Sequence, residues 1–116
     1  MSQIWQVRLS DQAELDLIAI SHWTAENFGP HQAEQYVETL LLAIDALGDG
    51  PRPFEAKVRS ELGAGIHTLH VTRQGRKGRH FVVYRVIDEQ ALDVLRVLHD
   101  SMDLVRHLPS TPDYSQ

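Results

Sequence analysis

The stretch FGPHQAEQYVETLLLAIDALG, residues 28–48, decides the fold, because it starts a long helix almost where a preceding one must stop. Proline is tolerated in the first turn of a helix, so Pro30 suits a helix start. Apolar residues then recur at steps of three and four, namely Ala33, Tyr36, Val37, Leu40, Leu41, Ile44 and Leu47. This spacing predicts an amphipathic helix that ends at Gly48.

The segment before it predicts a second helix. Asp11 and Glu14 have the spacing of a capping box, so we expect this helix to start there. It should run to about Asn27 and be stopped by Gly29 and Pro30. Two helices joined by so short a turn should form an antiparallel hairpin.

Alternating or β-branched apolar runs predict four strands, over residues 3–9, 65–72, 79–87 and 91–98. The last three are separated by the short links RQGRKG and DEQ, which suit antiparallel neighbours. The order strand, helix, helix, strand, strand, strand predicts an α+β fold, with a helical hairpin packed on an antiparallel sheet. We expect one domain over residues 1–116, with residues 110–116 as a frayed tail.

The composition bounds the class of protein. Hydrophobic residues make up 42% of the 116 residues and charged residues 23%, as in a folded globular domain. Cysteine is absent and the start shows no signal pattern, so we expect a soluble cytoplasmic protein with no membrane segment. The net charge of −5 argues against a protein that grips nucleic-acid phosphates.

Histidines raise the question of a metal site or a catalytic site. His67 and His70 fall on opposite faces of a strand, so they predict no metal site and no cofactor. His80 and Tyr84 share a strand face and could meet His99, which would allow acid–base chemistry. Ordinary hydrogen bonding in a sheet explains the same pattern, and we predict no catalytic residue.

Two segments carry charge next to the strands. RQGRKGR, residues 73–79, could bind phosphate or an acidic protein, or it could be a solvated hairpin tip. In HDSMDLVRHLP, residues 99–109, Ser101 can cap a short C-terminal helix that Pro109 ends. That helix could merely close the sheet, or it could present Arg106 and His107 to a target, with Met102 and Leu108 as anchors.

The ordered set of segments resembles the ParE branch of the ParE/RelE superfamily of type II toxin–antitoxin systems. The resemblance rests on AELDLIAISHWTAENFG (13–29), GRHFVVYRV (78–86) and VLRVLHDSMDLVRHLP (94–109). The resemblance implies a toxin of the kind associated with plasmid stabilisation. A ParD-like antitoxin would neutralise this toxin by wrapping the antitoxin tail around it. ParE-type toxins are associated with poisoning DNA gyrase, and RelE-type toxins with cutting mRNA on the ribosome.

The residues favour the gyrase branch. Phe81 stands at the position that resembles a strand arginine of RelE, and His67 follows Ile66 where the superfamily often has arginine. We therefore predict a non-enzymatic gyrase inhibitor that makes no specific contact with nucleic acid. A RelE-like mRNA endonuclease, and a homologue that keeps antitoxin binding but has lost toxicity, remain alternatives.

The site residues follow from this choice. The predicted target-binding residues are Arg79, His80, His99, Met102, Arg106 and His107. Apolar residues on the backs of the two helices should be covered by a partner. With one histidine beside them, they are the predicted antitoxin-binding residues Leu15, Ile18, His22 and Leu42.

Overall fold

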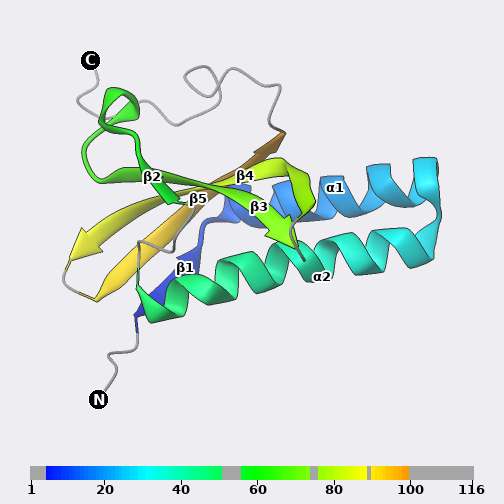
Figure 1. Cartoon of the computed structure of the whole chain (residues 1–116), viewed down its shortest axis with the longest axis horizontal. Coiled ribbons are helices and arrows are strands. Elements are labelled where there is room, and N and C mark those ends of the chain that lie inside the picture. Colours follow the sequence, from blue (N-terminus) through cyan, green and yellow to red (C-terminus); the bar gives the residue numbers. More distant parts are fainter. Residues whose placement is uncertain (1–4, 51–55, 74–75, 89, 100–116) are drawn as a thin grey trace.

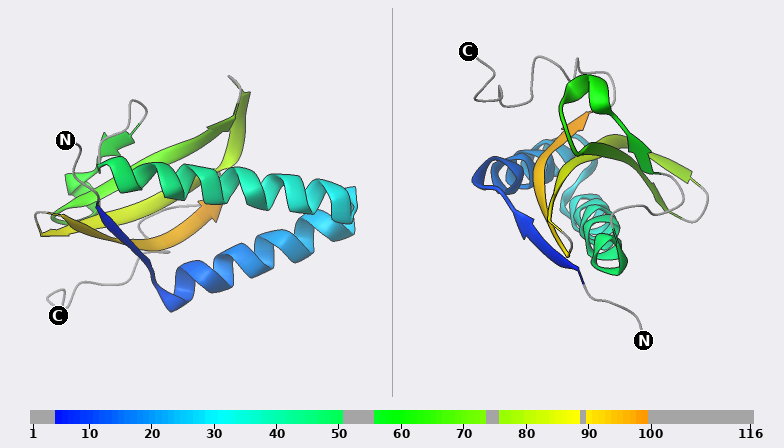
Figure 2. Two further views of the ribbon diagram at one scale, coloured as in Figure 1. Left: turned by 90° about the horizontal axis from the view of Figure 1, so that it is seen from below. Right: turned by 90° about the vertical axis from the view of Figure 1, so that its left-hand side faces the viewer.

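The computed structural model describes residues 5–50, 56–73, 76–88 and 90–99, and it places a helical hairpin on one face of a sheet (Figures 1 and 2). The helices are α1 (Asp11–Phe28) and α2 (Pro30–Ala46), and a short 3-10 turn, Leu47–Asp49, follows α2. The strands are β1 (Gln6–Leu9), β2 (Ala56–Val58), β3 (Ile66–Arg73), β4 (Arg76–Asp88) and β5 (Ala91–His99). The predicted α+β architecture with a helical hairpin on a sheet is confirmed.

The hairpin forms as the sequence predicts, but its first cap differs. The hydroxyl of Ser10 accepts from the backbone N–H of Ala13 at 3.0 Å, so Ser10 is the N-cap in place of the expected Asp11–Glu14 box. Asp11 and Glu14 lie in the first turn, where carboxylates complement the positive end of the helix dipole. Gly29 joins the helices with φ 97°, a backbone conformation that glycine adopts without strain.

The sheet departs from the expected antiparallel one in two ways. Its strand order is β1-β5-β4-β3-β2, and β1 runs parallel to β5, so the sheet is mixed. Sequence patterns mark strands but do not say which strand pairs with which. The second difference is β2, which pairs with β3 and lies outside the four predicted strands. Its three residues are too few to show an alternating pattern.

Two groups of buried side chains pack against the two faces of the sheet. The larger group lies between the sheet and the helices, and its buried members include Leu40, Leu47, Val82, Tyr84 and Val94. The smaller group, on the other face, consists of Ile66, Val83 and Leu98, with Phe81, Leu95 and Leu62 against them. His67 stacks on Tyr84 and His70 contacts Phe81, so the prediction that these two histidines face opposite sides is confirmed.

Candidate binding surfaces

A hydrogen-bonded cluster joins α2 to the start of β4. The hydroxyl of Tyr36 lies 2.7 Å from Nδ1 of His80, and it accepts the backbone N–H of Arg79 at 3.0 Å. Because the phenol oxygen already accepts from Arg79, its own proton can point to His80. In that arrangement Nδ1 of His80 is the acceptor, and the roles of the two atoms follow the tautomer of the ring.

His99 completes this cluster from the neighbouring strand. His80 and His99 are cross-strand partners in β4 and β5, and their rings meet edge to face with centroids 5.3 Å apart. We call Tyr36, Arg79, His80 and His99 the His80 cluster. The structure thus brings together three of the six predicted target-binding residues, whereas Met102, Arg106 and His107 lie outside the described residues.

The sequence analysis missed the role of Tyr36 in the His80 cluster, because it placed this residue only on the apolar face of a helix. The ring packs against the core while the hydroxyl reaches β4, a combination that a periodicity pattern does not reveal. His80 and Tyr84 both face the helices, as the sequence predicts. Tyr84 is fully buried beneath the helices and stacks on His67.

The predicted antitoxin-binding residues lie on the outer sides of the helices. Leu15, Ile18 and Leu42 are each more than half exposed, as the sequence predicts, and His22 is exposed as well. Leu15, Ile18 and His22 follow one another at steps of three and four, so they share one face of α1. The predicted exposure of these residues is confirmed, whereas their contact with an antitoxin stays a prediction.

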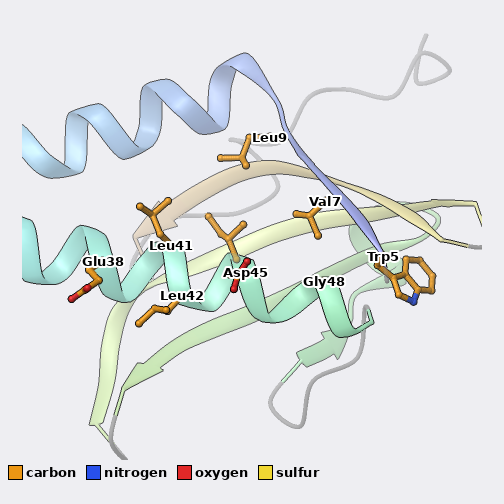
Figure 3. A pocket seen from close by; sticks show the side chains of 9 residues that line it. Trp5, Val7, Leu9, Glu38, Leu41, Leu42, Asp45 and Gly48 are labelled. Atoms are coloured by element: carbon orange, nitrogen blue, oxygen red, sulfur yellow. The ribbon is translucent and has the colours of Figure 1, made fainter. Parts of the chain in front are cut away.

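An apolar groove of about 570 Å³, which sequence reasoning missed, lies between β1 and α2. Figure 3 shows the side chains that line it from the two elements. Val7 and Leu9 of β1 line it, together with Trp5 just before that strand, and the lining residues from α2 include Leu41, Leu42 and Ile44. The charged residues among those that line this β1–α2 groove are both acids, Glu38 and Asp45.

The charged segments around these surfaces are described only in part. The side chains of residues 73–78 and the short helix expected after Ser101 lie outside the described residues. Within the described ranges, no group of three or more histidine and carboxylate side chains could hold a metal ion. Neither helix of the described hairpin is long and apolar enough to cross a membrane.

Comparisons with known proteins agree with the fold. The family model "ParE toxin of type II toxin-antitoxin system, parDE" matches residues 7–104. Toxin ParE1 of Mycobacterium tuberculosis is 37% identical over 100 residues, which cover 86% of this chain and 94% of the relative. Toxin ParE1 of Caulobacter vibrioides is 32% identical over 101 residues, which cover 87% and 95% of the two chains.

Solved structures give the same fold. A chain of the chromosomal ParDE system of P. aeruginosa superposes with a TM-score of 0.63 at 20% identity, covering 84% of this chain and 98% of that one. A chain of the RelBE2 toxin–antitoxin complex of Mycobacterium tuberculosis gives a TM-score of 0.51 at 26% identity, covering 85% and 94%. The matched family model and the curated relatives show that this chain belongs to the ParE toxins of type II toxin–antitoxin systems.

Proposed function

We propose that this ParE-family toxin acts in the cytoplasm by binding DNA gyrase, without catalysis of its own, and that a ParD-like antitoxin neutralises it. The related structures come from a ParDE system and from a RelBE2 toxin–antitoxin complex, which supports an antitoxin as the partner. The choice of gyrase over the ribosome rests on the residues of the sheet.

One observation carries this choice. Phe81 stands where the resemblance places a strand arginine of RelE-type nucleases, and it packs against the apolar group formed by Ile66, Val83 and Leu98. Cleavage of a phosphodiester needs donors or cations that stabilise the charge developing on the phosphate. An apolar ring packed at this position supplies neither, which supports inhibition by binding.

The His80 cluster is the best candidate for contact with the target. Arg79 is exposed, and His80 and His99 are partly exposed, so their polar atoms can reach a partner while Tyr36 holds the start of β4 in place. Met102, Arg106 and His107 follow His99 closely in the sequence, and we assign them to the same target surface. The antitoxin surface is assigned to Leu15, Ile18, His22 and Leu42.

Two assays on the purified toxin test the proposal side by side. In a gyrase supercoiling assay the toxin should inhibit, and added antitoxin should reverse the inhibition. In a translating-ribosome assay it should leave mRNA in the ribosomal A site intact. Codon-phased cuts that vanish on His80→Ala would establish the RelE-like endonuclease instead. A folded toxin that binds its antitoxin but inhibits neither gyrase nor growth would establish a homologue that has lost toxicity.

A further inference from the structure

The outer edge of β1 borders the β1–α2 groove. β1 is an end strand of the sheet, with β5 on one side of it. The backbone N–H groups of Gln6 and Ser10 donate to Gln90 and Val94, at 2.8 and 3.0 Å, and so they point toward β5. Backbone groups alternate in direction along a strand, so the N–H groups of Val7 and Leu9 point the other way, to the outer edge.

The same two residues line the groove with their side chains. Trp5 precedes them on this edge, and its N–H already donates to the carbonyl of Gly48 at 2.9 Å. A second strand laid along Val7 and Leu9 would therefore gain backbone hydrogen bonds. Its alternate side chains would point to the same side as those of Val7 and Leu9, toward Leu41 and Leu42 of α2.

The charge of the β1–α2 groove indicates which charge a bound segment should carry. The groove carries Asp45 and Glu38 and no cation among the residues that line it. Residues 1–50 contain one cation, Arg8, against eight acids, a balance of −7. A second copy of this chain would bring the same acids to the same place, so like charges oppose self-pairing. A segment with lysine or arginine complements the groove.

We propose that the antitoxin is captured by strand addition. An extended antitoxin segment, apolar at alternate residues and carrying lysine or arginine, pairs with the outer edge of β1 and fills the β1–α2 groove. This inference rests on the proposed antitoxin partner and adds where on the toxin the segment binds, in which conformation, and with which charge. An exposed sheet edge is a template for such pairing, whereas a helix in the groove would leave the edge unpaired.

Amide hydrogen exchange tests the backbone part directly. The ¹⁵N-labelled full-length toxin is compared alone and in complex with a ParD-like antitoxin. We expect exchange at Val7 and Leu9 to slow by at least about tenfold in the complex. Unchanged exchange at both amides in a complex that forms would overturn strand addition and leave the antitoxin assignment standing. Slow exchange in the toxin alone at high concentration would assign the edge to a second copy.

Matched charge variants test the groove. Asp45→Lys places a cation on the wall of the groove and should weaken antitoxin binding by about tenfold or more. Glu34→Lys makes the same change on an exposed position of α2 that does not line the groove, and it should change the Kd by less than about twofold. Equal effects of the two variants, measured by calorimetry on folded proteins, would contradict a cationic occupant.

Val7→Pro removes one outward N–H. The β1–β5 hydrogen bonds of Gln6 and Ser10 do not use that N–H, and edge strands tolerate proline. We expect the folded variant to bind its antitoxin at least about tenfold more weakly. Unchanged affinity would count against the inference, and the amide-exchange result decides the matter if this variant does not fold. Failure of the wild-type toxin to form any complex would instead refute the proposed function itself.

Discussion

The carboxylate of Asp16 in α1 accepts two hydrogen bonds from the guanidinium of Arg96 in β5, from Nε to Oδ2 at 2.8 Å and from Nη2 to Oδ1 at 2.9 Å. Oδ2 also accepts the backbone N–H of Val97 at 2.9 Å. β1 pairs with β5 only as far as Val94. Beyond that point, Asp16 of α1 provides the acceptor for a backbone N–H of β5. The hydrogen bonds from Arg96 to the carboxylate raise the pKa of Arg96, which therefore stays charged at any accessible pH.

Replacing Asp16 should destabilise the fold more than an ordinary surface change does. The side chains of Arg96 and Asp16 are only 18% and 11% exposed. Asp16→Ala would leave a largely buried guanidinium and a backbone N–H without their acceptor, at a cost of about 2–4 kcal/mol. Urea unfolding measures this loss of unfolding free energy. Asp16→Asn keeps an acceptor but no charge, so its unfolding free energy should lie between those of the wild type and Asp16→Ala.

The matched control is an exposed ion pair on a neighbouring strand pair. Arg8 of β1 lies 2.9 Å from Asp93 of β5, and the Arg8 side chain is more than half exposed. Arg8→Ala should cost less than about 1 kcal/mol, because water screens and replaces such a contact. If Asp16→Ala costs no more than Arg8→Ala, the ion pair between α1 and β5 contributes little to the fold.

Leu15→Glu tests the antitoxin surface on α1. Leu15 is 56% exposed, so a charged side chain there should change the melting temperature little. If an antitoxin covers Leu15, burying the new carboxylate should weaken the complex by about tenfold or more. Gln32→Glu adds the same charge at an exposed position near the hairpin turn and serves as the control. An unchanged Kd for folded Leu15→Glu would remove this residue from the interface.

Tyr36→Phe separates the hydroxyl of the His80 cluster from its ring. The variant keeps the packing of the ring but loses the acceptor for the N–H of Arg79 and the bond to His80, which should cost about 1–2 kcal/mol. If the His80 cluster meets the target, gyrase inhibition should fall as well, while antitoxin affinity is kept. Equal losses of both activities would point to a general loss of structure.

The sequence predicted the elements of the fold better than their pairing. The apolar spacing along α2 and the Gly29-Pro30 turn fix the hairpin locally, and three long strands follow from alternation. The parallel contact of β1 with β5 joins segments more than eighty residues apart, so no local pattern contains it. Choosing Ser10 over Asp11 as the cap also depends on a distant residue, because the Ser10 hydroxyl donates to the carbonyl of Leu95.

In the candidate sites too, local patterns could be predicted from the sequence, whereas contacts between distant segments could not. Exposure of Leu15, Ile18 and Leu42 could be predicted, because helix periodicity alone separates the inner side from the outer side. The β1–α2 groove could not, because its two walls come from elements that only the fold brings together. The link between Tyr36 and His80 spans 44 residues and is missing from any sequence pattern for the same reason.

Arg106→Glu tests whether the target surface extends past the end of β5. His99 is the last residue of β5 and lies against His80, so the end of this strand is part of the His80 cluster. A surface charge change should alter stability by less than about 0.5 kcal/mol. If Arg106 is part of the target surface, as proposed, growth inhibition and gyrase inhibition should nevertheless fall together, because a carboxylate would replace its cation. Antitoxin affinity should stay within about twofold. Lys57→Glu, an exposed reversal on β2, is the matched control and should remain toxic. Full toxicity of Arg106→Glu when it is expressed without antitoxin would make residues 100–109 a structural cap and confine the target surface to the His80 cluster.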